Sequence, residues 1–349
     1  MKKIFLKLAL YIMPFVVISI AAAFLPLNYF SYRCWEALSV KPDFLLPGPF
    51  YPFQKMVMTE EGDMGHGTPY AIKKKAYWET DRYGYRKKDS DEHPDIVIIG
   101  DSNIAGGSLT QEDTFAEVLQ RKLQRSVYPY APDDINHFIH DTRFTANPPR
   151  VVILEIIERS ILSHEQLQIK PKPQLSIKLK MKSLTSFSNR HLIQAAIVFS
   201  RILKLELLNK LKNKIEPKTI GFRYHGMFFY QGATADISAK DSEMQNTIKI
   251  ISAYNDYFKK NHIFFIYMPI PNKETIYYDF LPSKPGFSIL KQVLQGLKPA
   301  GVPTIDLLRA FEAFRQDGGN PFQIDDTHWS AMGVTIAADL VADMILHSE

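Results

Sequence analysis

Runs of apolar residues along the chain predict an α/β domain. Three short runs, rich in β-branched or aromatic residues, have the length of buried strands and occupy residues 96–99, 151–157 and 262–268. We expect Pro269 to end the third run. Helical spacing follows these runs in residues 113–123, 288–297 and 330–345. A further short strand is predicted over residues 302–306. Such alternation predicts a largely parallel sheet, with ligand chemistry at the carboxyl ends of its strands.

The longest uncharged run extends from Leu8 to Tyr32, after three lysines in the first seven residues. A span of about 20 apolar residues crosses a bilayer, and the preceding lysines favour a cytoplasmic N-terminus. A cleaved signal peptide, with Ala21 to Ala23 as processing site, is the alternative. Because its apolar region usually has about 7–15 residues, we favour an uncleaved anchor over residues 1–33. Both alternatives put residues 34–349 outside the cytoplasm.

Residues 34–92 are rich in Pro, Gly, Tyr and charge, and predict an irregular lead-in to a domain that spans 93–349. Within the lead-in, Thr80 to Arg86 carries two tyrosines around a glycine. A solvated loop does not need such aromatic residues, so we expect this stretch to pack on the domain that follows.

A basic insertion interrupts the domain over about residues 163–222. From Lys170 to Lys218 there are twelve basic residues and two acidic ones, a local charge of about +10. Part of it, residues 192–211, has helical apolar spacing. A cationic amphipathic segment of this kind can bind an anionic membrane or an acidic polymer, or it can be a solvated helical insertion. An extracytoplasmic location disfavours nucleic acid as partner.

Composition adds limits to this description. With 349 residues, of which 46% are hydrophobic and 23% charged, the chain can bury a sizeable core and is not a disordered protein. Cys34 is the only cysteine, so no internal disulfide supports the fold.

Candidate chemistry begins at Ser102, which follows the first strand in the sequence Gly-Asp-Ser-Asn. A strand that delivers a serine into a turn exposes its hydroxyl and directs nearby backbone N–H groups to one spot, as an oxyanion hole requires. The alternative is a helix cap, because Asp and Ser commonly satisfy the first N–H groups of a helix. The motif alone does not decide between the two.

His328 favours catalysis. It lies just before the last predicted helix, with Asp326 two residues and Asp325 three residues upstream. A histidine base needs a carboxylate that fixes its tautomer and stabilises the imidazolium. An acid–His pair can also bind a metal, but the other histidines are scattered without a second such element. We expect neither a metal nor another cofactor.

Together these residues resemble the SGNH (GDSL-type) hydrolase superfamily. The string Asp326-Thr-His-Trp-Ser is closer to one branch, the alginate O-acetyltransferase-like (AlgX/AlgJ-like) proteins. Further similar stretches are Thr80 to Arg86, Glu158-Arg159 and Pro269 to Tyr277. The resemblance covers roughly residues 78–160 and 262–345, and leaves the basic insertion unmatched.

The resemblance implies a three-layer α/β/α domain with Ser102 as nucleophile, His328 as base and an aspartate as orienting residue. The Asp-x-His spacing of the branch indicates Asp326, which we favour, whereas the Asp-x-x-His spacing of the superfamily indicates Asp325. The superfamily's glycine and asparagine donors to the oxyanion hole have no clear counterpart here. We expect the Ser102 N–H to serve, with Arg159 or an N–H of Ala105 to Gly107 (Gly106 and Gly107 included) as its partner.

Three further residues are substrate candidates. Lys273 and Tyr277 follow a Pro-Ile-Pro stretch and are expected either to contact a sugar or carboxylate, or to belong to a rigid proline loop with a solvated lysine. Trp329 is expected either to shield His328 or stack on substrate, or to pack in the core.

The sequence thus predicts a membrane-anchored, extracytoplasmic O-acyltransferase, with acetyl as the expected group, that acts on a cell-envelope or exported glycan through an acyl-serine. An esterase of the same fold is the alternative, since water can replace the sugar. The resemblance also implies a multispanning membrane acyltransferase as acyl donor. A non-catalytic glycan-binding or envelope-assembly protein is the alternative from another class.

Overall fold

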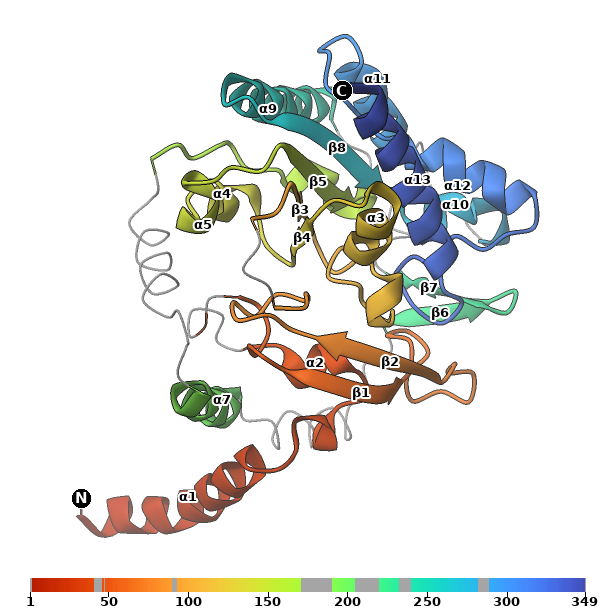
Figure 1. Cartoon of the computed structure of the whole chain (residues 1–349). Coiled ribbons are helices and arrows are strands. Elements are labelled where there is room, and N and C mark those ends of the chain that lie inside the picture. The colour runs from red at the N-terminus through yellow and green to blue at the C-terminus, as the bar shows by residue number, and fades with distance from the viewer. Residues whose placement is uncertain are drawn as a thin grey trace.

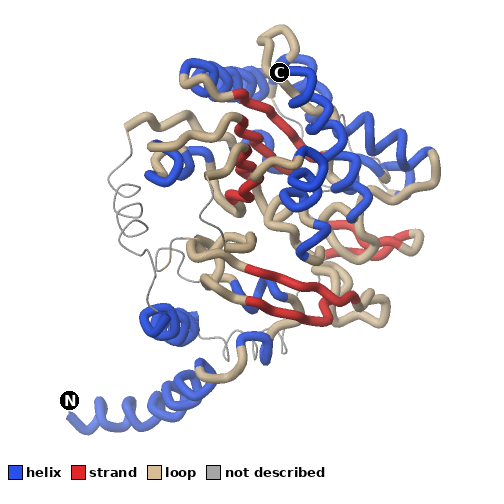
Figure 2. Tube along the Cα trace, viewed as in Figure 1, coloured by secondary structure: helices blue, strands red, loops and turns tan. Residues whose placement is uncertain are grey.

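The computed structural model describes residues 2–40, 46, 48–89, 93–170, 190–204, 220–231, 240–281 and 289–348. Figure 1 and Figure 2 show a sheet with its helices, a separate hairpin below it, and a long N-terminal helix that extends away from both. Most of the basic insertion, residues 171–189 and 205–219, lies outside the described residues.

The core of the domain is a four-stranded parallel sheet with strand order β4-β3-β5-β8. Its strands are β3 (Ile96–Ile99), β4 (Val127–Tyr130), β5 (Val151–Ile157) and β8 (Phe264–Ile270). Every residue of β3 is buried, which explains its unbroken β-branched run. The predicted α/β fold with a parallel sheet is confirmed.

Two strand predictions differ from the structure. β8 continues through Pro269 to Ile270, and residues 302–306 contribute only a single parallel bridge between Thr304 and Tyr267. The Tyr267 N–H donates to Pro303 O, and N–H groups in a parallel strand face alternate sides. The nitrogen of Pro269 therefore faces the side on which pairing has already ended, where no N–H is required.

Helices cover both faces of this sheet. They are α3 (Phe115–Leu123), α4 (Ile135–Phe138), α5 (Thr142–Thr145), α9 (Asp241–Lys260), α10 (Lys273–Ile276), α11 (Ile289–Leu297), α12 (Leu307–Gln316) and α13 (Ala331–Ser348). The chain leaves β3 toward β4 and then reverses direction across the sheet, so right-handed connections put α3 on one face and α9 and α11 on the other. The contacts of α13 with α3, and of α11 with α9, agree with this three-layer arrangement (Figure 1).

The lead-in is more regular than the sequence indicates. It contains α2 (Cys34–Leu38) and an antiparallel hairpin of β1 (Lys55–Glu60) and β2 (Lys74–Glu79). Trp78 of β2 is fully buried against the rings of Phe50 and Trp35. The prediction of an irregular lead-in is wrong for these residues. The hairpin is stabilised by pairing of β1 with β2 and by aromatic packing, and both join residues that are separated by a long connection.

The remaining elements are short, apart from two helices near the N-terminal end of the molecule. They are η1 (Leu27–Phe30), η2 (Gln111–Asp113), η3 (Glu158–Ser163), η5 (Tyr278–Phe280), the hairpin of β6 (Gly221–Tyr224) and β7 (Met227–Tyr230), and the helices α1 (Lys2–Ala23) and α7 (Arg190–Lys204). Among the described residues, α1 and α13 are long and apolar enough to cross a membrane. α13 packs against α3 in the core, whereas the apolar side chains of α1 are mostly exposed.

Candidate active site

Ser102 lies in a turn directly after β3, at the carboxyl end of the central strand pair. Its carbonyl accepts a hydrogen bond from Gly107 N at 2.9 Å, so residues 102–107 close on themselves. Ser102 itself is half-buried. Within the described chain neither its N–H nor its hydroxyl has a hydrogen-bond partner. Both groups that nucleophilic chemistry would use are therefore available.

His328 lies against this turn and is paired with Asp326. Its Nδ1 is 2.5 Å from Asp326 Oδ1, and its backbone N–H donates to the same oxygen at 2.9 Å. The other ring nitrogen, Nε2, is buried and has no hydrogen-bond partner among the described residues. No hydrogen bond joins it to Ser102 in this structure. A carboxylate on Nδ1 favours the tautomer that leaves Nε2 free to accept a proton.

Gly107 permits this close approach. A Cβ on Gly107 would lie 2.6 Å from His328 Nε2, so any side chain would push the ring away. Gly106 has φ +75°, in the left-handed region that favours glycine, and a Cβ there would lie 2.6 Å from Arg86 Nη1. Both glycines thus bring the turn against its neighbours.

Of the two aspartates that the spacing allowed, Asp326 is the one that contacts His328. Asp325 Oδ2 instead accepts from the N–H groups of Gly62 and Ile72, at 3.1 and 2.7 Å. Its carbonyl accepts from Met64 and Gly65. Asp325 therefore joins the lead-in to the histidine loop.

Two residues that the sequence did not indicate surround this pair. Asp63 donates its N–H to Asp326 Oδ2 at 2.9 Å, and its carboxylate accepts from Thr327 N and Oγ1. Ser108 donates its hydroxyl to Asp326 Oδ2 at 2.5 Å. The only local signal for Asp63 is its place in a glycine-rich turn of the lead-in, which does not indicate a partner more than 260 residues away.

His328 and Asp326 stabilise each other's charged forms. Burial lowers the pKa of His328, but the Asp326 carboxylate and its hydrogen bond outweigh burial and raise the pKa above 6.5. Burial raises the pKa of Asp326, but the charge and hydrogen bond of His328 hold it well below 3.8. Burial, and next the charge of Asp326, raise the pKa of Asp63. Asp326 is therefore the ionised partner of the histidine.

Arg86 of the Thr80 to Arg86 stretch supports the serine turn. Its guanidinium is buried, stacks on Trp78 with 3.7 Å to the ring centroid, and donates to the carbonyls of Ala105, Gly106 and Leu109. The stretch from Thr80 to Arg86 thus contacts the domain through hydrogen bonds from Arg86 to the turn that follows Ser102.

The expected oxyanion donors are only partly available. The N–H groups of Ala105, Gly106 and Gly107 already donate to Asp101, Asn103 and Ser102 carbonyls, which removes the predicted contribution of residues 105–107 in this arrangement. Arg159 is exposed after β5, and its guanidinium lies 5.6 Å from the centroid of the Tyr230 ring. Its side chain remains free of the serine turn.

Lys273 differs from both expectations, since it is neither solvated nor in a groove. It is 2% exposed, and its Nζ donates to the carbonyls of Gln323, Ile324 and Asp326. Burial lowers the pKa of Lys273 to about 8. The lysine thus fixes the loop that carries the acid–His pair, because three carbonyls converge on one ammonium.

Tyr277 and Trp329 are packing residues. Tyr277 is buried beneath Arg315, with its hydroxyl 3.3 Å from Asn320 Oδ1. Trp329 is fully buried against Phe115 of α3. For both residues the structure therefore contradicts substrate contact.

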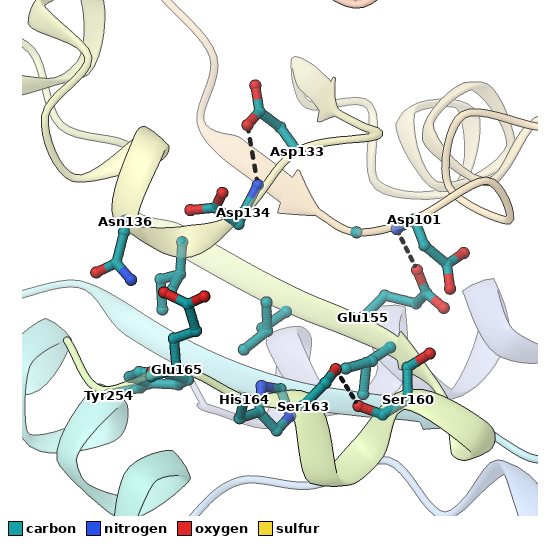
Figure 3. A pocket seen from close by; sticks show the side chains of 14 residues that line it. Asp101, Asp133, Asp134, Asn136, Glu155, Ser160, Ser163, His164, Glu165 and Tyr254 are labelled. Atoms are coloured by element: carbon teal, nitrogen blue, oxygen red, sulfur yellow. Dashed lines mark hydrogen bonds between the residues drawn. The ribbon is translucent and has the colours of Figure 1, made fainter. Parts of the chain in front are cut away.

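A cavity of about 310 Å³ is lined in part by Gly100 and Asp101, the two residues before Ser102, while Ser102 and His328 are not among its described lining residues (Figure 3). Its acidic lining residues are Asp101, Asp133, Asp134, Glu155 and Glu165. No lysine or arginine is among the described residues that line it. Glu155 Oε2 accepts from Asp101 N at 2.9 Å, and burial raises the pKa of Glu155 well above 4.5. The cavity therefore offers many oxygen acceptors beside the serine turn.

Two groups among the described residues have the composition of a metal site, so the expectation of a single acid–His element was wrong. They are Asp63, Asp326 and His328, and Asp133, Asp134 and His137. Burial lowers the pKa of His137, but hydrogen bonds and charges of its two aspartates raise it to about 9. An imidazolium has no lone pair for a metal, so the second group is an ion-pair cluster at neutral pH.

Comparison with known proteins identifies the last third of the chain. Residues 226–349 match the family described as the SGNH hydrolase-like domain of acetyltransferase AlgX. No curated protein matches the chain. The match includes the Asp326–His328 pair but not Ser102.

Solved structures give weaker likenesses. A putative lipolytic G-D-S-L family protein from Desulfitobacterium hafniense has 12% identity and a TM-score of 0.36, covering 72% of this chain and 99% of its own. A lipase/acylhydrolase from Enterococcus faecalis has 12% identity and a TM-score of 0.39, covering 73% and 97%. An acetyl xylan esterase from Butyrivibrio proteoclasticus has 8% identity and a TM-score of 0.33, covering 80% and 68%. Likenesses of this size do not bear on substrate. The resemblance to the AlgX branch of the SGNH superfamily is confirmed by the family match over residues 226–349.

Proposed function

We propose that the chain is a serine-dependent O-acyltransferase, with acetyl as the transferred group, that modifies a glycan outside the cytoplasm. The observation that carries the proposal is His328, whose Nδ1 is bonded to Asp326 and whose Nε2 is unpartnered against the turn that contains Ser102. The match to the AlgX acetyltransferase domain supports acyltransferase or esterase activity.

The chemistry has two proton-balanced steps. His328 Nε2 takes the Ser102 proton while Oγ forms an ester bond to the acyl carbon, and the imidazolium returns that proton to the departing group of the donor. An acceptor hydroxyl then gives its proton to His328 and attacks the acyl-serine, and Ser102 recovers a proton as the ester bond breaks. The unpartnered Ser102 N–H is available to the oxyanion in both steps. Water as acceptor makes the same site an esterase.

The Ser102 hydroxyl and His328 must approach each other for the first step. Catalytic hydrogen bonds are often formed only with substrate present, and both groups are already unpartnered. A non-catalytic glycan-binding protein is the second candidate, favoured by the missing Ser102–His328 hydrogen bond in the described structure.

The proposed location of the enzyme rests on α1. We propose that α1 is an uncleaved anchor with the domain on the extracytoplasmic side, and that a multispanning membrane acyltransferase supplies the acyl group. Ala22 and Ala23 at the end of α1 are buried, with exposed fractions of 7% and 3%. The end of α1 therefore packs against the rest of the folded chain, which supports a structural role for this segment.

The acid-rich cavity beside Ser102 is the proposed acceptor site. Its carboxyl oxygens accept hydrogen bonds from sugar hydroxyls, and the absence of a lysine or arginine among its described lining residues disfavours a polyuronate. A neutral glycan is therefore the proposed acceptor class.

Trapping of the acyl-enzyme tests this function. The full chain in detergent is mixed with an activated acetyl ester, and intact-mass and peptide mass spectrometry locate the acetyl group. We expect one acetyl group on Ser102, nitrophenol release from the ester, and neither with Ser102→Ala. Addition of a neutral oligosaccharide should move acetyl to the sugar.

Ser108→Ala is the matched control, since Ser108 is in the same turn but bonds to Asp326. It should still form the adduct, more slowly. An unchanged rate of ester cleavage in Ser102→Ala would support the glycan-binding alternative.

A further inference from the structure

Helix α7 is bound to the end of α1. Arg201 of α7 donates to the carbonyl of Ala23 at 2.8 Å and also to that of Leu25. Arg201 is only 3% exposed. The last carbonyls of a helix lack intrahelical donors and favour a cation, so this contact satisfies the end of α1. Figure 1 shows α7 beside the C-terminal end of α1.

One face of α7 is fixed to the lead-in. Ile193 and Ile197 are buried in a cluster with Val40, Leu46 and Tyr51. The Tyr51 hydroxyl donates to Ser200 Oγ at 3.1 Å, and Lys204 donates to the Ser39 carbonyl. The orientation of α7 relative to the domain and to α1 is therefore defined by packing and hydrogen bonds.

The opposite face of α7 is also apolar, although it is not covered by described parts of the chain. Phe199 and Leu203 are 52% and 45% exposed. Ala195, one turn earlier on this face, is exposed, Val198 and Ile202 are half-buried, and the exposed His191 lies at the N-terminal end of the same face. A helix on the surface of a soluble domain carries polar residues at such positions, and a contiguous exposed apolar face marks an interaction surface.

We propose that this outer face of α7 lies in the headgroup boundary of the bilayer that α1 spans. The inference rests on the anchor role of α1 in the proposed function. If α1 crosses the membrane, its end at Ala23 is at the extracytoplasmic boundary, and the Arg201 bonds hold α7 at the same depth. An apolar face next to the end of a membrane-spanning helix suits the headgroup boundary of a bilayer.

The consequence is a fixed orientation of the catalytic domain. α1 alone would leave the domain free to turn about a single tether at η1. With α7 in the interface, α1 and α7 together define the distance of the serine turn from the membrane. A membrane-bound acyl donor would deliver its group across this distance.

Site-directed spin labelling of the full chain in proteoliposomes of neutral and anionic phospholipid tests this inference. Nitroxides are attached to Phe199→Cys and Leu203→Cys, and their collision rates with oxygen and with a water-soluble nickel chelate are compared. Cys34 is fully buried and is expected to remain unlabelled. We expect oxygen to dominate at both positions.

Two reference positions separate the possible failures. Phe15→Cys in α1 reports the anchor, and Tyr278→Cys, on an exposed tyrosine of η5, reports water. If Phe15 is lipid-exposed and the α7 labels behave as Tyr278 does, the inference about α7 is wrong while the anchor stands. If Phe15 is also nickel-accessible, the anchor and the inference fail together. Quenching of Phe199→Trp fluorescence by brominated lipid gives a second measurement without a nitroxide, and absence of quenching contradicts the proposal.

Discussion

Asp325 and Asp326 are adjacent in the chain, yet their carboxylates have different partners. Asp326 accepts from His328 on one oxygen and from Asp63 N and Ser108 Oγ on the other. Asp325 accepts only backbone N–H groups in the contacts described for its carboxylate. At the scale of single residues, this difference separates an orienting carboxylate from a loop tether.

We expect Asp326→Asn to lower kcat for ester cleavage by about 10⁴, because an amide favours the wrong tautomer of His328. The matched control is Asp325→Asn, which removes a backbone tether and should leave kcat within about tenfold. The measurement is nitrophenol release with both purified variants. Equal losses in the two variants would contradict the assignment of Asp326.

The pH dependence follows from the raised pKa of His328. The histidine must be neutral to accept the Ser102 proton, so kcat/KM should rise with pH and level off only above a pKa higher than 6.5. In Asp326→Asn the carboxylate that raises the pKa of His328 most is lost, while burial still lowers this pKa. The midpoint of the pH profile should therefore move to lower pH. A pH profile of both proteins checks this, and an unmoved midpoint would remove Asp326 as the cause.

At the scale of elements, the site depends on buried cations that bind loop carbonyls. Arg86 donates to the turn after β3, and Lys273 of α10 donates to the loop before α13. Carbonyl groups in irregular segments need donors when they are buried, and a long cationic side chain can serve several at once. The two loops that carry Ser102 and His328 are thus held by residues distant in sequence.

Arg86→Met should lower the free energy of unfolding by at least about 1–3 kcal/mol, the cost of a buried carbonyl without its donor. It should also reduce kcat, because residues 105–109 support the His328 ring. Arg82→Met is the control, since Arg82 pairs with Asp89 near the surface and should change stability by about 0–1 kcal/mol. Denaturant unfolding and ester cleavage are measured on each. A small effect in Arg86→Met would show that the turn is stable without it.

Gly107→Ala tests the contact between turn and base. A Cβ would lie 2.6 Å from His328 Nε2, so we expect a loss of activity of at least about tenfold, from a displacement that need not unfold the turn. The measurements are kcat and the thermal midpoint. Parallel losses of both would indicate a folding defect instead of a displaced base.

At the scale of the whole molecule, several distant segments form the acidic cavity. Its lining comes from the ends of β3 and β5, the segment after β4, η3 and α9 (Figure 3). Elsewhere in the domain, the lead-in, the turn after Ser102 and the histidine loop are joined to one another through Asp63, Asp325 and Arg86. The lining of the proposed acceptor site is therefore formed only in the assembled domain.

We expect a neutral oligosaccharide to accept acetyl with a higher kcat/KM than a uronate oligomer of equal length. Asp101 and Glu165 in the cavity repel an anionic sugar, whereas Asp133 and Asp134 are paired with His137. Added salt should narrow the difference in kcat/KM because it screens this repulsion. Glu165→Gln should likewise narrow it. The measurement is acetyl transfer to each sugar at two salt concentrations, and a preference for the uronate would contradict the cavity assignment.

Local sequence alone predicts the strands 96–99 and 151–157 and locates Ser102 and His328, because β-branched runs and short motifs act through neighbours in sequence. It did not determine the lead-in hairpin, the continuation of β8 through Pro269, or the buried roles of Lys273 and Trp329. These features depend on contacts between residues far apart in the chain, such as the hydrogen bond from the Thr327 N–H to the Asp63 carboxylate across 264 residues. The choice between Asp325 and Asp326 required the folded chain, since both spacings fit a histidine base and packing alone brings one carboxylate to Nδ1.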